Sequence, residues 1–333
     1  MIWGIWANQA KRTVMTPWPN IRGSSKVTRL LDFSTSVARA TLWRQRSQKD
    51  FLAVFNWHQV TPTFDSLVHH KYTWTPLERF KREVDYAVRK FQVLPLHEAI
   101  SRLKNGSLRG RCASFNFDDG DISIAEHVVP FLRQRGLPAT FFINSAYLDG
   151  KLTYWFPILN YFEATQGAGV SLPHDLKENA SGLRKTADPV FYNEVRTKIE
   201  EFASLIPNLG ARLVSANWLS TLDGDQFAIG AHGHEHQRFS LMPTDWQRND
   251  LRDNQRVLRD FRGYRPIFAV PFGRPTDWTT DTVRIARAEG LDVVLADGGI
   301  NVTAADSYRR IPSDDKALGP LIAAGWRTNQ IVK

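Results

Sequence analysis

Two aspartates stand side by side where a buried strand is expected to end. Asp118 and Asp119 follow the alternating stretch 113–117 and precede Gly120, a residue typical of turns. Carboxylates this close repel each other, which raises the pKa of one of them unless a cation lies nearby. A surface Asp-Asp-Gly turn is the simpler interpretation of the triplet alone, so a chemical role needs support from elsewhere in the chain.

A group of histidines provides that support. His232, His234 and His236 lie within five residues of one another. A helical turn would bring His232 and His236 to one side, whereas an extended segment would bring all three to one face. A solvated His-rich loop is the alternative to a metal site. Two imidazoles and one carboxylate form an open zinc site, so we expect a divalent metal ion, zinc being favoured, with the second aspartate free to act as a base.

The elements that must position these residues alternate between strand and helix patterns. Strands are predicted at 51–57, 113–117, 139–143, 227–229, 267–270 and 291–295, with a short one at 93–94. His58, the Asp118 pair and the histidine group each follow a strand, and so does Phe272. About seven such units favour a barrel over an open sheet, with the active residues at the carboxyl ends of the strands.

Helices are predicted between these strands. They cover 77–91, a segment ending at Leu103, 124–135, 245–261 and 280–289. Thr75 is predicted to cap the first of them with Pro76 at its first position, and Thr244 is predicted to cap the fourth.

The domain organisation follows from where the alternation starts and breaks. Residues 1–48 are irregular apart from a helical pattern near 27–46, and we expect an N-terminal extension there. A barrel domain would span 49–333, with a helical insertion at about 147–217 that includes a helix at 189–205.

Composition narrows the function classes. The 333 residues carry a formal charge of +9, which favours acidic partners. The sequence contains no run of five basic residues, so we expect no nucleic-acid site. The single cysteine, Cys112, excludes an internal disulfide and a Cys-based zinc site. No apolar stretch is long enough to span a membrane and the first residues do not resemble a signal peptide, so we expect a cytoplasmic protein. Tryptophans near the N-terminus leave a peripheral membrane contact open.

Three segments resemble the leading motifs of the polysaccharide deacetylases, the family-4 carbohydrate esterases or NodB-homology proteins. They are Phe117-Asp118-Asp119-Gly120, His232-Gly233-His234-Glu235-His236 and Phe268-Ala269-Val270-Pro271-Phe272-Gly273. The resemblance covers roughly 51–312 and implies a distorted (β/α)7 barrel. The segment Asn56-Trp57-His58-Gln59-Val60 resembles the opening motif of the circularly permuted branch, in which the acid histidine comes first.

The resemblance also implies a role for each site residue. The catalytic base would be Asp118, the metal ligands Asp119, His232 and His236, the oxyanion donor the backbone N–H of Phe272, and the acid His58. Two departures stand out, because Ala269 replaces the arginine that steadies the family's base and no histidine follows His236. Arg310 is a candidate for the missing cation.

The function implied is metal-dependent removal of an acetyl group from an N-acetylated sugar in a polysaccharide or glycoconjugate pathway. A nucleotide-linked or lipid-linked sugar would suit the basic charge. Two alternatives stay open. Another metal-dependent amidohydrolase on a small amide would bind its metal through His232 and His234, and a non-catalytic carbohydrate-binding relative would be consistent with Ala269.

Overall fold

The structure is a computed structural model, and it describes residues 50–65, 69, 73–150, 154, 197 and 212–313. The predicted N-terminal extension with its helix, and nearly all of the predicted insertion with its helix at 189–205, lie outside the described residues. Those interpretations stay predictions. Within the described part of the chain, no helix has the length and apolar character that crossing a membrane requires.

A parallel sheet of nine strands forms the centre of the described region. Its members are β1 (Phe51–Trp57), β4 (Gln92–Val93), β5 (Arg111–Phe117), β6 (Ala139–Ile143), β7 (Phe227–Ala231), β8 (Tyr264–Ala269), β9 (Asp292–Leu295), β10 (Ser307–Arg309) and β11 (Ile311–Pro312). The order is β10-β9-β8-β7-β6-β5-β1-β11, with β4 beside β5. Each predicted strand is therefore present. A separate short pair, β2 (Gln59–Thr61) and β3 (Trp74–Pro76), follows β1.

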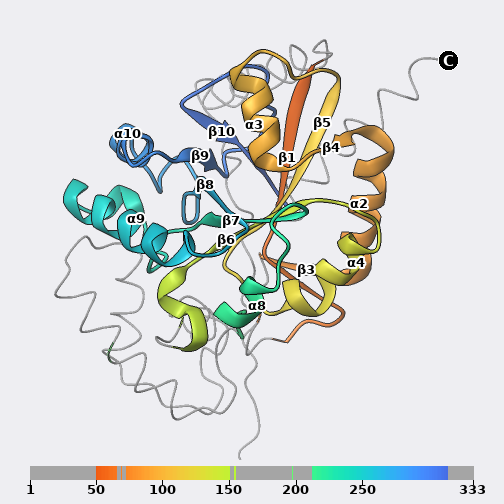
Figure 1. Cartoon of the computed structure of the whole chain (residues 1–333), viewed down its shortest axis with the longest axis horizontal. Helices are drawn as coiled ribbons and strands as arrows, with labels where there is room; N and C mark the ends of the chain where they lie inside the picture. The colour runs from red at the N-terminus through yellow and green to blue at the C-terminus, as the bar shows by residue number, and fades with distance from the viewer. Residues whose placement is uncertain are drawn as a thin grey trace, which may run out of the picture. The chain divides into compact units, whose positions relative to one another are not determined.

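The two ends of the sheet are nearly joined by one short segment. β10 and β11 lie at opposite ends of the strand order, yet only Arg310 separates them in the chain. Arg309 pairs with Leu295 of β9, and Ile311 pairs with Phe55 of β1. This segment closes the sheet into the distorted (β/α) barrel that the sequence predicted, and the helices lie around the strands (Figure 1).

The helices differ from the predictions mainly at their ends. They are α2 (Leu77–Lys90), α3 (Leu96–Lys104), α4 (Val129–Arg133), α8 (Ala216–Ser220), α9 (Thr244–Leu258) and α10 (Thr280–Ala288). The helix expected at 124–135 is divided into a π-helical turn, Ile124–Val128, and α4. Pro130 lacks the N–H that would continue a regular ladder at this place.

Both predicted threonine caps were wrong. Thr75 belongs to β3, where it pairs with Val60, and Pro76 occupies the cap position of α2 without a side-chain hydrogen bond. Thr244 is the first residue of α9 and follows Pro243. For Thr75, pairing with Val60 outside the helix decides where the threonine lies.

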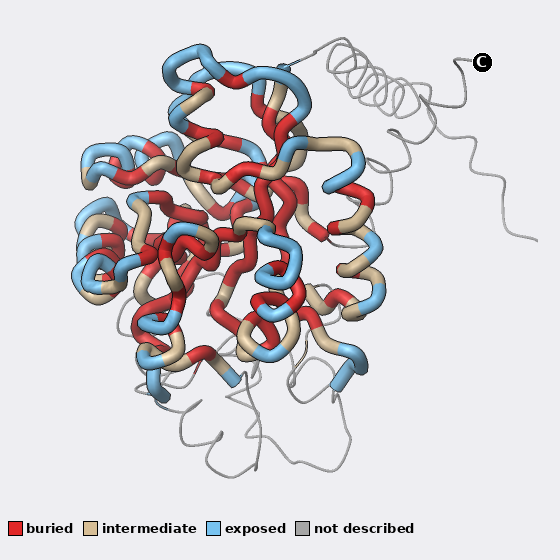
Figure 2. The backbone as a smooth tube through the Cα atoms, turned by 45° about the vertical axis from the view of Figure 1, so that its right-hand side comes forward, coloured by how far each residue is buried: buried red, intermediate tan, exposed pale blue. Residues whose placement is uncertain are grey.

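The strands have one face toward the barrel interior and one toward the helices. On β5, Phe115 and Phe117 pack with Phe80 of α2 in the outer core. Cys112 belongs to a second apolar cluster formed by interior residues such as Val54. Side chains two residues apart share a face, so Asp118 faces the same interior as Cys112. Figure 2 shows these strands as the buried part of the molecule, with exposed backbone on the outer helices.

Candidate active site

The predicted site residues converge at the carboxyl ends of the strands. His58 follows β1, Asp118 and Asp119 follow β5, and His232 follows β7. Asp119, His232 and His236 offer ligand atoms that all lie within 4.8 Å of one another. Of the groups of acidic, histidine and cysteine side chains in the described residues, this one has the spacing to hold a metal ion.

Asp119 lies between the two imidazoles. Its Oδ1 atom is 3.3 Å from Nε2 of His232 and 3.3 Å from Nε2 of His236. The Nδ1 atom of His232 lies 2.8 Å from the backbone oxygen of Ala269. A carbonyl oxygen only accepts, so Nδ1 donates its proton, and Nε2 is the ring nitrogen that faces Asp119.

The properties of this triad fit a divalent metal ion. Asp119 Oδ1 is buried, and no hydrogen bond of good geometry reaches it from the described residues. Burial alone would raise the pKa of Asp119, but His236 and His232 outweigh it and hold the pKa well below its usual range. Burial lowers the pKa of His236 to about 3, which keeps the imidazole neutral. Burial would lower the pKa of His232, but Asp118 and Asp119 outweigh it and raise the pKa, so this imidazole would release a proton when a metal ion binds. Two imidazoles and one carboxylate suit zinc and related ions.

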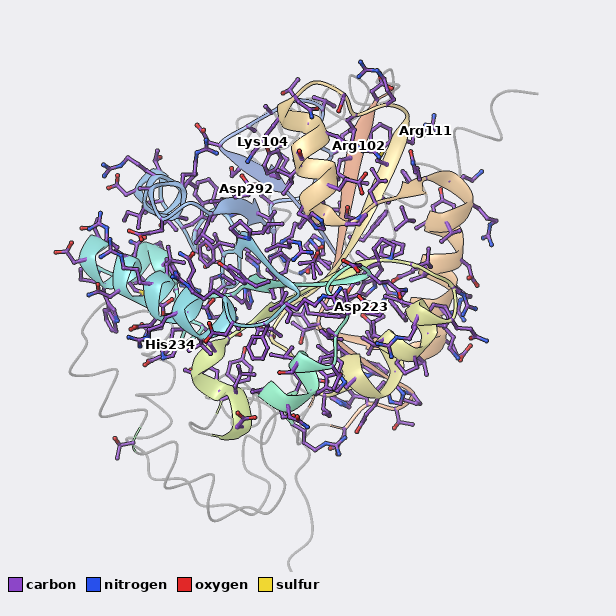
Figure 3. The ribbon with its side chains drawn as sticks, viewed as in Figure 1. Arg102, Lys104, Arg111, Asp223, His234 and Asp292 are labelled. Carbon is purple, nitrogen blue, oxygen red and sulfur yellow. The ribbon has the colours of Figure 1, made fainter. Side chains whose placement is uncertain are left out.

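His234 takes no part in the triad. Its Nδ1 atom lies 2.9 Å from Oγ of Ser145, and Figure 3 labels it between α9 and the 3-10 segment Ser145–Gly150. The arrangement His232 with His234, which would have favoured a different amidohydrolase, is therefore not what the structure shows.

Asp118 has quite different partners. Its Oδ1 accepts a hydrogen bond of 2.6 Å from Arg310, and its Oδ2 accepts one of 3.0 Å from the side-chain amide of Asn56. Arg310 also donates to Asn56 Oδ1 at 3.1 Å. Burial would raise the pKa of Asp118, but Arg310 and His232 outweigh it and lower the pKa. The carboxylate is therefore held ionised.

Arg310 provides the cation that Ala269 cannot, from the segment that joins β10 to β11. Arg310 is fully buried and stands between β10 and β11, from where its guanidinium reaches Asp118. Ala269 is also fully buried, and its backbone oxygen orients His232. The sequence named Arg310 only as a candidate, because the distance of 192 residues to Asp118 hides the contact.

His58 lies on the side of Asp118 away from Arg310's contact. Its Nε2 is 3.8 Å from Asp118 Oδ2, and its side chain is 22% exposed. Of the site imidazoles, it is the one with access to solvent, since the side chains of His232 and His236 are 2% and 4% exposed.

Phe272 packs against the triad through its ring. The ring centroids of Phe272 and His236 are 4.7 Å apart. Phe272 has a φ of 60° and Gly273 one of 66°, so the chain turns sharply here. A Cβ on Gly273 would lie 2.7 Å from the backbone nitrogen of Ala296, so only glycine fits this turn.

Sequence reasoning missed two residues of the site. Asn56, which holds both Asp118 and Arg310, stood in a quoted motif but had no role assigned. Tyr154 is 5% exposed and presents its ring edge to His236, with centroids 5.5 Å apart and planes at 87°. The only signal for Tyr154 was its place in an aromatic run, and for Asn56 its polarity within an apolar strand.

Comparisons with known proteins agree with this geometry. Residues 105–184 match the family model described as polysaccharide deacetylase. No curated protein matches the chain significantly by sequence.

Solved structures share the fold. IcaB from Ammonifex degensii is 18% identical, with a TM-score of 0.56 over 83% of this chain and 97% of that one. The de-N-acetylase from Aggregatibacter actinomycetemcomitans is 14% identical, with a TM-score of 0.57 over 82% and 99%. The Streptococcus pyogenes deacetylase PplD in complex with acetate is 15% identical, with a TM-score of 0.52 over 83% and 98%. At such identities these structures support the barrel fold rather than a shared substrate.

The first motif, with Asp118 and Asp119, lies inside the residues that the family model matches. The histidine motif meets it in space, as the resemblance required. The chain thus matches the polysaccharide deacetylase family model over residues 105–184 and shares its fold with deacetylases of known structure.

Proposed function

We propose that this protein is a metal-dependent hydrolase that removes the acetyl group from an N-acetylated sugar. The observation that carries the proposal is the division of partners between two adjacent carboxylates. Asp119 lies against two imidazoles, whereas Asp118 lies against a guanidinium and an amide. Both oxygens of Asp118 are engaged by these donors, so Asp119 is the carboxylate that suits a ligand role and Asp118 the one that suits a base.

The metal ion would be held by Asp119, His232 and His236, and we propose zinc because of this donor set. When bound, the ion would lower the pKa of a water molecule and polarise the acetyl carbonyl. Asp118 would take the proton of that water as its oxygen forms a bond to the carbonyl carbon.

The leaving group needs a proton when the carbon–nitrogen bond breaks. We propose His58 as the donor, and its position supports this role, because its Nε2 lies 3.8 Å from Asp118 and its side chain reaches solvent. The backbone N–H of Phe272 would stabilise the oxyanion formed between attack and bond cleavage. The products are acetate and the free amino sugar, so atoms and protons balance without another reactant.

The substrate we propose is a phosphate-bearing N-acetyl sugar, either nucleotide-linked or lipid-linked. The formal charge of +9 favours an anionic substrate over a neutral one. Contact with an anionic membrane surface would be compatible with a lipid-linked substrate.

Metal analysis and acetate release test the proposal together. The purified protein should contain about one divalent ion per chain and release acetate from at least one member of a panel of nucleotide-linked, lipid-linked and polymeric N-acetyl sugars. Asp118→Asn should abolish turnover with the metal retained, and Asp119→Ala should lose the metal. Asp225→Asn is the control, because Asp225 is exposed and pairs with Arg262 at the surface.

Two results would overturn the proposal. A metal-loaded wild-type protein that releases no acetate from any member of the panel would support a non-catalytic role. Metal loss in Asp118→Asn would mean that the two aspartates have exchanged roles.

A further inference from the structure

Helix α9 has an unusual buried face. Gln247, Asp250 and Asn254 are 3%, 5% and 0% exposed, and they lie on the same face as the apolar Leu251 and Leu258. Buried polar groups are costly unless hydrogen bonds replace their contacts with water. Gln247 bonds the backbone just before its own helix, at Met242. Asp250 and Asn254 instead form hydrogen bonds with the backbone of residues 233–235.

Asp250 and Asn254 contact the backbone between the two histidine ligands. Asp250 Oδ1 accepts a hydrogen bond of 2.8 Å from the N–H of His234, and Oδ2 accepts one of 3.2 Å from the N–H of Glu235. The side-chain amide of Asn254 lies 2.7 Å from the oxygen of Gly233. Two side chains one helical turn apart therefore hold two consecutive peptide groups, 233–234 and 234–235.

The same amide of Asn254 connects the turn to its neighbour. It lies 3.0 Å from the oxygen of Ile143, the last residue of β6, and 2.9 Å from Oγ of Ser145. Ser145 in turn contacts the ring of His234. The turn is thus fixed against both α9 and the end of β6.

The turn needs such support because its backbone is strained. Gly233 has a φ of 75° and His236 a φ of 53°, which is unfavourable for a residue with a side chain. A Cβ on Gly233 would lie 2.9 Å from Asp250 Oδ1, so the carboxylate lies directly against the turn. These left-handed residues let both imidazoles face Asp119 within five residues.

Burying the carboxylate of Asp250 at this place costs free energy of folding. Among the described residues, no lysine, arginine or histidine forms an ion pair with it, and Glu235 and Asp253 add negative charge nearby. Burial raises the pKa of Asp250 to about 7. An apolar residue would pack here at lower cost, so the carboxylate is best explained by the two N–H groups that it accepts from.

We propose that Asp250 and Asn254 are positioning residues that fix the 232–236 turn, so that His232 and His236 face Asp119 before a metal ion binds. The proposal rests on the proposed metal site and adds to it a support from outside the motifs. Removing a residue of this kind leaves every ligand in place but lowers the metal affinity, because the unbound turn samples other conformations.

Zinc affinity of the metal-free protein, measured by competition with a chromophoric chelator, is the main test. Asp250→Ala and Asn254→Ala should each bind zinc about 10-fold to 100-fold more weakly than wild type. Asp253→Asn is the matched control, because Asp253 lies on the same helix and pairs with Arg256 at the surface. It should bind zinc as wild type does.

Amide hydrogen exchange in the metal-free protein gives an independent measurement. The amides of His234 and Glu235 should exchange faster in Asp250→Ala, with no such change in the control. Asp250→Asn keeps the volume and one acceptor oxygen, so it should fall between wild type and Asp250→Ala and remains informative if Asp250→Ala does not fold.

The inference fails if folded Asp250 and Asn254 variants bind zinc as tightly as wild type, or if the two amides keep their protection. If the wild-type protein binds no zinc at all, the proposed function fails instead. Amide exchange alone then decides whether α9 holds the turn.

Discussion

The two halves of the candidate site are held by different kinds of contact. The base half, around Asp118, is fixed by the side chains of Arg310 and Asn56. The ligand half, around His232 and His236, is fixed through its backbone by α9 and by the carbonyl of Ala269. In the base half, a guanidinium and an amide hold the carboxylate itself. In the ligand half, hydrogen bonds to the backbone hold the turn that carries the imidazoles.

Under the proposed function, the difference follows from what each half would have to do. A base must stay ionised beside a cationic site without becoming a ligand, so both oxygens of Asp118 accept hydrogen bonds from fixed donors. Ligands must keep their lone pairs open toward the ion. Their orientation is therefore set from behind, through Nδ1 of His232 and through the peptide groups between the ligands.

Arg310→Met breaks the base half and should have the largest effect. It leaves the buried carboxylate of Asp118 without its cation, which should destabilise the protein by about 3–5 kcal/mol in urea unfolding. The double variant Asp118→Asn/Arg310→Met is the control, because no charge is left unpaired and the loss should be much smaller. If Arg310→Met lowered the stability equally in the wild-type protein and in the Asp118→Asn variant, Arg310 would not be stabilising the charge of Asp118.

His58→Gln sharpens the division of roles within the base half. Turnover should fall by about 100-fold to 10,000-fold because the leaving amine loses its proton donor. Metal content and the unfolding midpoint should match wild type, since His58 is partly exposed and outside the triad. A loss of metal in this variant would place His58 in the ligand half.

Asp250→Asn tests the ligand half through its pH dependence. The pKa of Asp250 is about 7 in the folded protein against 3.8 as its ordinary value, so the folded form binds the proton more tightly. Ionisation should therefore destabilise wild type as the pH rises from about 4 to about 7, with no further loss above that range. Asn cannot ionise, so the stability of the variant relative to wild type should be greater at about pH 8 than at about pH 5. Asp245→Asn, at an exposed position of the same helix where Asp245 pairs with Arg248, should show no comparable shift in urea midpoints.

Lys104→Ala at the opposite end of the barrel should have the smallest effect. Lys104 at the end of α3 pairs with Asp292 at the start of β9 (Figure 3), and its side chain is 47% exposed. Exposed ion pairs contribute about 0–1 kcal/mol. Zinc affinity and turnover should not change, and a marked change in either would mean that the two ends of the barrel are coupled.

The sequence predicted the barrel and the convergence of Asp119, His232 and His236 because both depend on local patterns. Strand alternation and turn residues mark the ends of β5 and β7, and parallel pairing then brings these ends together. The role of each residue in catalysis stays a prediction, since geometry alone does not measure turnover.

Of the supports, Arg310 was named from the sequence only as a candidate and Asp250 and Asn254 were missed, for one physical reason. Arg310, Asp250 and Asn254 are polar residues whose types favour a solvated surface, and only the packing of distant elements shows that they are buried. The wrong cap at Thr75 has the same origin, because local propensity cannot show that Thr75 pairs with Val60 in a strand.

The closing segment of the barrel has a consequence for the order in which the site is assembled. Arg310 lies between the strands that complete the sheet, so it meets Asp118 only when 307–312 pairs with both β9 and β1. A chain in which this segment has not yet paired would already carry the three ligands but would lack a stabilised base. Under the proposed function, this segment would therefore have to pair before the base could act.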